Sequence, residues 1–185
     1  MEWRELEQTC RECRACELCR TRHNVVLEAG NREAVVMFIG EGPGEQEDLQ
    51  GIPFVGPAGK LLDDMLSIID MDRSSCYIAN IVKCRPPRNR DPLETEQEAC
   101  ISYLWNQIAL VQPKIIVCLG RIAAKKLIRE DFRITREHGM WVEQEGIWRM
   151  AIYHPSALLR DVTKRPETFV DLLSLRDKMR QLGIV

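Results

Sequence analysis

The clearest hydrophobic feature of the sequence is a set of short apolar runs, each followed by a glycine or a polar residue. Runs of this kind, rich in branched side chains, are typical of strands that are buried on both faces of a parallel sheet. Open α/β sheets bind their ligands at the carboxyl ends of such strands, so the residues that follow each run are candidates for a functional site. The runs occupy residues 34–39, 77–82, 114–119 and 151–153.

Helical patterns fill the intervals between the runs. Residues 140–150 instead alternate around a turn at 144–146, which predicts a hairpin at the sheet edge. Gly183 stops the last helix. The segments that we expect to be helical are residues 2–22, 60–69, 121–129 and 166–182.

A further helix has a recognisable start. Asp91 suits the N-cap, Pro92 suits the first helical position, and Glu94 stands three residues after the cap. The apolar spacing then predicts a helix to about Val111. Strands that alternate with helices predict one α/β domain, a three-layer sandwich with a central, mainly parallel sheet.

The bulk composition excludes some classes of protein. Of 185 residues, 45% are apolar and 29% are charged, which suits one globular domain with a substantial core. No apolar run approaches the length needed to cross a bilayer. The N-terminus is charged and lacks the apolar core of a signal peptide, so we expect a cytoplasmic protein without a membrane partner.

The net charge of −2 is less informative than its distribution. Lys83, Arg85, Arg88 and Arg90 fall within eight residues with no acid among them. Such a patch can neutralise phosphates, the main source of sequence-independent affinity for DNA. The alternative is a solvated basic surface without a ligand.

Eight cysteines in a chain without secretory features indicate metal or redox chemistry rather than a disulfide framework. Thiolates from two parts of the chain suit zinc or an iron–sulfur cluster, and spacing alone does not separate the two. Cys76 and Cys118 accompany strands and are expected to be buried and unligated. The other candidates are Cys10, Cys13, Cys16 and Cys19, which recur at every third residue, and Cys84 and Cys100.

Two loops rich in glycine and proline follow the first apolar run. Residues 40–44, GEGPG, form a tight loop at the strand end and contain one acid, Glu41. Residues 51–59 present a single aromatic side chain, Phe54. A carboxylate and a ring on neighbouring loops favour a small planar ligand. The alternative is a turn against which the phenylalanine packs.

These loops carry a resemblance to a known family. GEGPGEQED followed by GIPFVGPAGKLL is similar to the first motif of the family 4 uracil-DNA glycosylases, iron–sulfur enzymes that excise uracil from DNA. YIANIVKCRPP at 77–87 and HPS at 154–156 continue the resemblance in order over nearly the whole chain. Gly42 stands where many members carry alanine, which leaves the motif intact. The resemblance implies the uracil-DNA glycosylase fold, with a four-stranded parallel sheet in a single domain of residues 1–185.

The family pattern also implies a cofactor, one [4Fe-4S] cluster, completed by an N-terminal cysteine segment of about residues 1–22. Every adjacent pair in the N-terminal cysteine repeat has the same spacing, so the roles of Cys10 and Cys19 stay open. The implied ligands are Cys13, Cys16, Cys84 and Cys100.

The reaction that the resemblance implies is the hydrolysis of the N-glycosidic bond of a flipped uracil, which leaves an abasic site in base excision repair. The protein would act as a monomer on single- or double-stranded DNA. The amide of Asn80 can donate to uracil O4 and accept from N3–H, a pattern that cytosine reverses. Phe54 would stack on the base, and His154 would donate to O2, where negative charge develops.

The remaining site residues serve the sugar and the DNA. Glu41 would orient water or stabilise the cationic sugar, with Gly40 and Gly42 supplying backbone groups. Glu47 is the candidate for crowding the C5 methyl group of thymine. The candidates for DNA contact are Lys83, Arg85, Arg88 and Ser156 for phosphates, and Leu158, Leu159 and Arg160 for a wedge that replaces the flipped base.

Two other functions compete with this one. A nucleic-acid-binding protein stabilised by a cluster or by zinc, without catalysis, explains the cysteines and the basic loop. It gives Glu41, Asn80 and His154 no joint role. An electron-transfer protein would need neither the basic loop nor the HPS motif.

Overall fold

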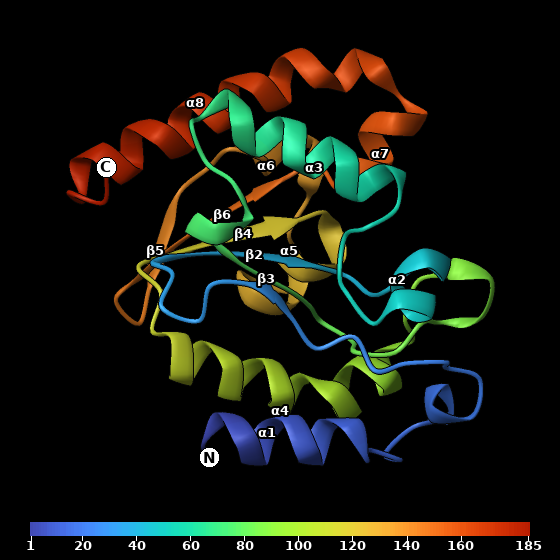
Figure 1. The fold of residues 1–185 in the computed structure, drawn as a ribbon. Helices are drawn as coiled ribbons and strands as arrows, with labels where there is room; N and C mark the ends of the chain where they lie inside the picture. The colour runs from blue at the N-terminus through green and yellow to red at the C-terminus, as the bar shows by residue number, and fades with distance from the viewer.

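The apolar runs form the centre of a six-stranded sheet in a computed structural model that describes all 185 residues (Figure 1). The strands are β1 Ala29–Gly30, β2 Val36–Gly40, β3 Tyr77–Asn80, β4 Ile115–Leu119, β5 Val142–Gln144 and β6 Ile147–Ile152. Their order in the sheet is β1-β3-β2-β4-β6-β5. Neighbours within β3-β2-β4-β6 are parallel, whereas β1 and β5 pair antiparallel at the edges.

The prediction of a mainly parallel α/β sheet is therefore confirmed, but a sheet of only four strands is not. The hairpin of β5 and β6 has the predicted turn, since Gln144 pairs with Ile147. The other edge strand, β1, is two residues long and carries no apolar pattern. A segment of two residues, one alanine and one glycine, gives no strand signal in the sequence.

Helices cover both faces of the sheet (Figure 1). In β2, Val36 and Phe38 point to one face and Met37 and Ile39 to the other, as a period of two requires. The first face packs against α3, α7 and α8, and the second packs against α4 and α5. The helices are α1 Trp3–Arg11, α2 Glu45–Gln50, α3 Pro57–Ile68, α4 Glu94–Val111, α5 Arg121–Leu127, α6 Ile134–Glu137, α7 Pro155–Arg160 and α8 Arg165–Gln181.

The N-terminal segment differs from the continuous helix expected over residues 2–22. Helix α1 ends at Arg11, and the chain resumes with a 3-10 turn at Glu17–Arg20. Between Arg11 and Arg22, Leu18 is the one large aliphatic side chain and is buried, so an amphipathic face cannot continue. The break places Cys13 and Cys16 in an irregular segment, free to turn toward the body of the protein.

The start of α4 also differs from the prediction. The helix begins at Glu94, not directly after Asp91. The carboxylate of Glu96 accepts from the backbone N–H of Leu93 at 2.7 Å, while Asp91 pairs with Arg121. Asp91 is therefore used across the fold rather than as a cap. No helix in the chain is both long and apolar enough to span a membrane.

Candidate active site and cysteine pocket

At the carboxyl ends of β2 and β3, two predicted site residues, Asn80 and Phe54, lie against Gly40, and His154 lies beside the Phe54 ring. A Cβ atom on Gly40 would lie 2.5 Å from Oδ1 of Asn80 and 2.7 Å from Cζ of Phe54, so only glycine fits here. The ring of Phe54 lies 5.5 Å from that of His154, centroid to centroid, with the planes tilted by 30°. Gly42 follows on the same loop and lies beside the side chain of Val82.

The side chain of Asn80 is the most informative group at this point. Asn80 is 2% exposed, and its Oδ1 atom has no hydrogen-bond partner in the protein. A buried acceptor without a partner costs about 1–3 kcal/mol, so such groups are uncommon in folded proteins. The free acceptor therefore suits a donor supplied by a ligand that lies next to the Phe54 ring.

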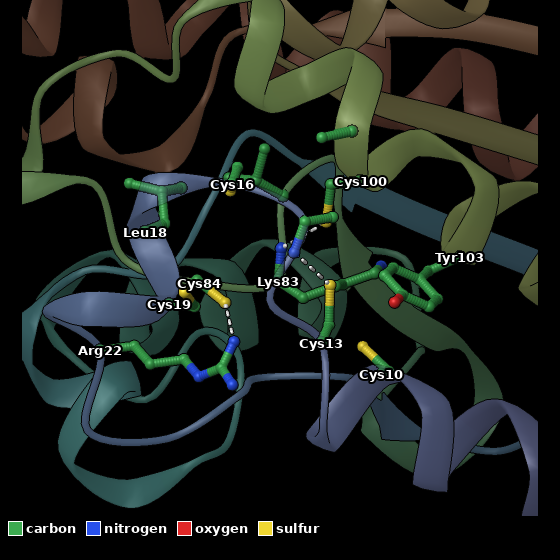
Figure 2. A pocket seen from close by; sticks show the side chains of 13 residues that line it. Cys10, Cys13, Cys16, Leu18, Cys19, Arg22, Lys83, Cys84, Cys100 and Tyr103 are labelled. Carbon is green, nitrogen blue, oxygen red and sulfur yellow. Dashed lines mark hydrogen bonds between the residues drawn. The ribbon is translucent and has the colours of Figure 1, made fainter.

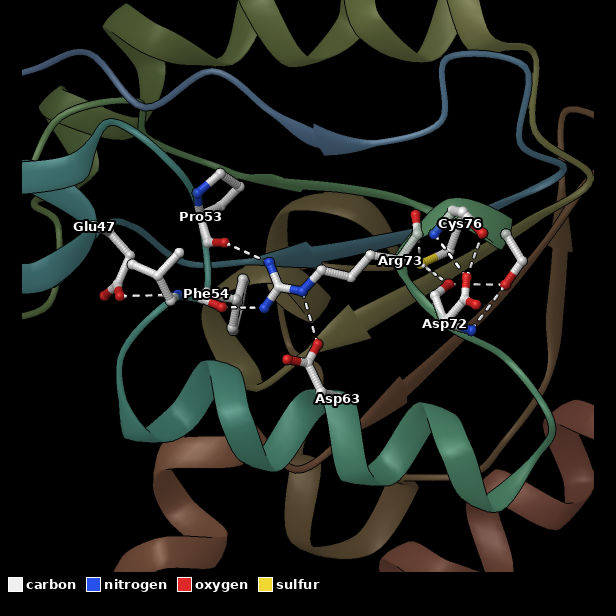
Figure 3. Close-up of polar contacts among 10 residues, drawn as sticks. Glu47, Pro53, Phe54, Asp63, Asp72, Arg73 and Cys76 are labelled. Carbon is white, nitrogen blue, oxygen red and sulfur yellow. Dashed lines mark hydrogen bonds and ion pairs between the residues drawn. The ribbon is translucent and has the colours of Figure 1, made fainter.

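The loop that carries Phe54 is fixed from both ends, as Figure 3 shows for several of the contacts. The carboxylate of Glu47 accepts from the backbone N–H groups of Gly44 at 3.1 Å, Val55 at 3.2 Å and Gly56 at 2.8 Å. Glu47 thus holds two loops together through their backbones, a role that the sequence did not indicate. Its predicted contact with a C5 methyl group stays a prediction.

Arg73, which no sequence motif indicated, holds the same loop from the other side. Its guanidinium donates to the carbonyl of Pro53 at 3.0 Å and to that of Phe54, and it pairs with Asp63 at 2.7 Å (Figure 3). Phe54 itself has a φ of 56°, in the left-handed region that costs a bulky residue free energy. These contacts hold the backbone of Phe54 in this left-handed conformation and so fix the position of its ring.

His154 is held in one tautomer. It is the N-cap of α7, and its Nδ1 atom accepts from the backbone N–H of Ser156 at 3.0 Å. Because Nδ1 is an acceptor, the neutral ring carries its proton on Nε2. Burial lowers the pKa of His154 to about 4, and the charge of Arg160 acts in the same direction. His154 is therefore a neutral Nε2–H donor at neutral pH.

Ser156 belongs to the same arrangement. Its hydroxyl lies 2.7 Å from Nδ1 of His154, so the side chain turns toward the imidazole. A hydroxyl that donates to Nδ1 has no hydrogen left for a phosphate, and the predicted phosphate contact of Ser156 stays a prediction. Ser156 orients His154 through both its backbone and its side chain.

Glu41 is one of the residues that line a cavity of about 270 Å³. Burial raises the pKa of Glu41, and the nearby carboxylate of Asp91 raises it further, while Arg121 and Arg160 oppose the shift. Arg121 was not predicted, although it directly follows the glycine at the end of β4. The polar residues that line the cavity are Glu41, Asn89, Asp91, Arg121, His154, Ser156, Arg160 and Lys164.

The basic loop presents fewer cations than its sequence suggests. Arg88 is exposed, and Arg85 is half-buried with Nε donating to Oδ1 of Asn89 at 2.7 Å. Arg90 is paired with both carboxylate oxygens of Glu96, at 2.7 and 2.9 Å. Lys83 is 1% exposed, so the prediction that it contacts a phosphate is wrong for this structure.

The predicted wedge also changes. Leu158 is 1% exposed because it packs in the core between α7 and the sheet, so it cannot enter DNA. Leu159, the next residue, is 43% exposed, and Arg160 is exposed as well. Adjacent residues of a helix lie about 100° apart around its axis, so one of two neighbouring leucines can be buried while the other is exposed, and the sequence alone did not decide which.

Six of the eight cysteines line one cavity on the side of α1 and α4 (Figure 2). They come from α1, from the segment that follows it, from the loop after β3 and from α4. Cys76 and Cys118 lie elsewhere and are fully buried, as predicted. The six are Cys10, Cys13, Cys16, Cys19, Cys84 and Cys100.

Two positive or polar donors face the sulfur atoms of this pocket (Figure 2). Nη1 of Arg22 donates to Sγ of Cys84, and the backbone N–H of Lys83 donates to Sγ of Cys100, both at 3.3 Å. Hydrogen bonds and cations at the sulfurs are typical of thiolate-bound metal and iron–sulfur sites, where they stabilise the negative charge. The donor set therefore fits a thiolate-ligated group.

The thiols are not yet arranged as a coordination shell. No three His, Cys, Asp or Glu side chains are placed so that they could hold a metal ion. Burial raises the pKa of Cys100 to about 11 and also raises the pKa of Cys84, which Arg22 opposes. Both shifts favour the protonated thiol, and a bound metal would displace its proton. Cys10 and Cys19 line the same pocket, so the choice among adjacent pairs stays open.

Comparison with known proteins identifies the family of the chain. Residues 27–175 match the family model described as the Uracil DNA glycosylase superfamily. The chain is similar to the type-4 uracil-DNA glycosylase of Archaeoglobus fulgidus, at 46% identity over 155 residues, which covers 80% of this chain and 78% of the relative. It is 49% identical to that of Saccharolobus solfataricus over 80% of this chain and 73% of the relative. With that of Thermotoga maritima the identity is 42%, over 82% of this chain and 80% of the relative.

The family match covers every strand-end residue around Gly40 and Asn80, and begins downstream of the N-terminal cysteines. The relatives extend the likeness to most of the chain at 42–49% identity. A buried unpartnered amide, a stacked ring and a fixed imidazole donor occupy the matched region. The chain belongs to the type-4 uracil-DNA glycosylases of the uracil DNA glycosylase superfamily.

Proposed function

We propose that this protein excises uracil from DNA by hydrolysing the N-glycosidic bond, leaving an abasic site for base excision repair. The observation that carries the proposal is the buried, unpartnered Oδ1 of Asn80 beside the Phe54 ring and the Nε2–H of His154. An amide acceptor, an aromatic face and a fixed donor are the three groups that a flipped uracil needs. The family membership agrees with this chemistry.

Base recognition rests on Asn80. Its free Oδ1 accepts from uracil N3–H, and its amide nitrogen donates to O4. Cytosine presents an acceptor at N3 and a donor at C4, so both bonds would be lost in the interior. Phe54 stacks on the base without regard to its identity, which contributes binding but no selectivity.

Departure of the base rests on His154. Breaking the bond between N1 and C1′ leaves negative charge on uracil O2. A neutral imidazole that is fixed as an Nε2–H donor can stabilise this charge without prior reorganisation. The low pKa keeps the ring neutral through the physiological range, so it acts as a hydrogen-bond donor rather than as a cation.

Attack on the sugar rests on Glu41. Its carboxylate lies in the cavity next to His154, from where it can orient water and stabilise the cationic sugar. The ionised form is the active one, and the raised pKa makes that form pH-dependent. Arg121 and Arg160 flank the same cavity and suit the phosphates on either side of the flipped nucleotide.

We propose that one [4Fe-4S] cluster is held by Cys13, Cys16, Cys84 and Cys100. When bound, such a cluster supplies a covalent tie between distant chain segments and requires no redox turnover. The four cysteines come from the N-terminal segment, from the loop after β3 and from α4. Arg22 and the Lys83 backbone N–H offset the charge at the sulfurs. We further propose that the protein is a cytoplasmic monomer.

The proposed function is tested by single-turnover assays on oligonucleotides that contain one uracil, followed by cleavage of abasic sites. Release of uracil with no reaction at thymine or cytosine is expected. Tight DNA binding without release would instead identify a binding protein that lacks catalysis. Single- and double-stranded substrates run side by side give the strand preference.

Replacement of Arg85 and Arg88 by alanine should weaken DNA binding equally at all sequences. Each lost phosphate contact should lower the slope of log affinity against log salt by about 1. Arg90→Ala is the matched control, because Arg90 is already paired with Glu96. Fluorescence anisotropy between low and high salt measures the slopes. Equal slopes for all three proteins would show that this loop does not contact the backbone.

Replacement of Asn80 by aspartate should lower the ratio of uracil to cytosine excision rates by about tenfold or more, since a carboxylate cannot donate to O4. A protonated aspartate can also donate to N3 of cytosine. Single-turnover rates on matched oligonucleotides give the ratio. Asn106→Asp, on α4 away from the site, controls for the added charge. A ratio that does not change in Asn80→Asp would show that another group reads the base.

A further inference from the structure

Lys83 is a buried cation that the proposed reaction does not use. Its ammonium donates to the backbone carbonyl of Asn80 at 2.7 Å and to Oε1 of Gln107 at 2.5 Å. Lysine is almost never fully buried unless its charge and its donors are satisfied. The question is why a lysine is buried with its ammonium bonded to the backbone of Asn80, the residue proposed to read the base.

The reason lies in the edge of the sheet. The backbone N–H of Ile81 donates to the carbonyl of Gly40 at 2.9 Å, so the carbonyl of Asn80 points the opposite way, toward β1. Strand β1 pairs only with Tyr77 and Ile78 and does not reach Asn80. Without Lys83, the Asn80 carbonyl would be a buried acceptor at an unpaired edge. The ammonium takes the place of the missing strand.

Lys83 is itself fixed from several directions. The amide nitrogen of Gln107 donates to the carbonyl of Leu27 at 3.0 Å and to the hydroxyl of Tyr77 at 2.8 Å, which orients Oε1 toward the ammonium. The backbone carbonyl of Lys83 accepts from Val26 at 2.8 Å. Its backbone N–H contacts Cys100, as described above. The ammonium therefore reaches Asn80 from a rigid base that includes the cysteine pocket.

We propose that Lys83 is a positioning residue for uracil recognition: it fixes the backbone of Asn80 at the open edge of β3, so that Oδ1 stays directed at the base. The same residue ties this position to the cysteine pocket. The proposal rests on the proposed function, because it requires that Asn80 reads the base. It assigns no contact between Lys83 and the substrate.

Two variants separate this role from general stabilisation. Lys83→Met removes the bond to Asn80, whereas Gln107→Met removes the other acceptor of the same ammonium and leaves that bond in place. The measurement is the affinity for an oligonucleotide with one uncleavable 2′-fluoro-2′-deoxyuridine, relative to the same oligonucleotide with thymidine. This preference should fall about tenfold in Lys83→Met and less than twofold in Gln107→Met. Both variants should keep the iron content of the wild type.

Equal losses of preference in the two variants would overturn the proposal, as would an unchanged preference in Lys83→Met. If Lys83→Met fails to fold or loses its iron, Lys83→Arg decides, because it keeps the charge and the donors. Recovery of at least half of the wild-type preference on a logarithmic scale supports the proposal, and a loss below that contradicts it. If the wild-type protein releases no uracil, the proposed function is wrong. If the wild type is active but Lys83→Met does not change the preference, only the inference about Lys83 is wrong.

Discussion

Replacement of Glu41 by glutamine is expected to slow uracil release by about a hundredfold or more, the usual effect of removing a general base or a charged stabiliser. Glutamine keeps the shape of the side chain but cannot take a proton or carry a negative charge. Binding to an uncleavable uracil analogue should change little, because Glu41 is not assigned to the base. The ratio of uracil to cytosine rates should also be retained, unlike in Asn80→Asp.

The pH profile gives an independent readout of the same residue. Burial and Asp91 raise the pKa of Glu41, so its carboxylate is lost as the pH falls through a value higher than that of a free glutamate. The wild-type rate should therefore decline on the acid side, and Glu41→Gln should lack this decline. His154 does not titrate there, because its pKa lies near 4.

Asp91→Asn is the matched control for this profile. It removes the carboxylate that raises the pKa of Glu41, so the acid decline should move to lower pH without disappearing. If Glu41→Gln altered base preference as strongly as Asn80→Asp, the glycine loop and not β3 would read the base. Single-turnover rates between pH 5 and pH 8 distinguish these outcomes.

Serine in place of Cys84 or Cys100 is expected to abolish the brown colour of the purified protein and most of its iron. The unsubstituted protein should carry about four iron and about four sulfide per chain, the content of one four-iron cluster. A serine hydroxyl does not replace a soft thiolate ligand, and these two cysteines supply all the sulfur from the loop after β3 and from α4.

Cys76→Ser and Cys118→Ser are the controls, because both side chains are buried but lie outside the pocket. Burying a hydroxyl should lower their stability, yet both variants should keep the full iron content and the visible spectrum. Cys10→Ser and Cys19→Ser, measured in the same way, identify which adjacent pair of the N-terminal repeat ligates. Zinc instead of iron after anaerobic purification would contradict the cluster.

The sequence predicted the parts of the fold that depend on burial along the chain. Strands β2, β3 and β4 are unbroken apolar runs, and each was placed within about two residues. Strand β1 was missed, because Ala29 and Gly30 are a strand only through pairing with β3. The break after α1 was missed because Cys13 continues the helical spacing of the apolar residues before it. In the structure the chain has left the helix at this point, and Cys13 lines the cysteine pocket.

For the candidate site, the sequence identified residues that follow the ends of apolar strands. Asn80 and Phe54 do meet at Gly40, and His154 lies beside the Phe54 ring. What failed were statements about which way a side chain points. A lysine is normally expected at the surface. Lys83 is buried because two distant parts of the chain, the end of β3 and Gln107 on α4, offer acceptors to its ammonium. Arg73 escaped notice for the same reason, since its partners are Asp63 and two backbone carbonyls that only the fold brings near it.

The carboxylate of Glu47 has a consequence for motion. It bonds backbone amides of both glycine-rich loops, so neither loop can open without breaking bonds that also restrain the other. Entry and exit of the base therefore involve one hinged unit rather than two independent flaps. The local opening free energies of Gly44 and Gly56 should be linked, and an insertion tolerated in one loop would be felt as altered dynamics in the other.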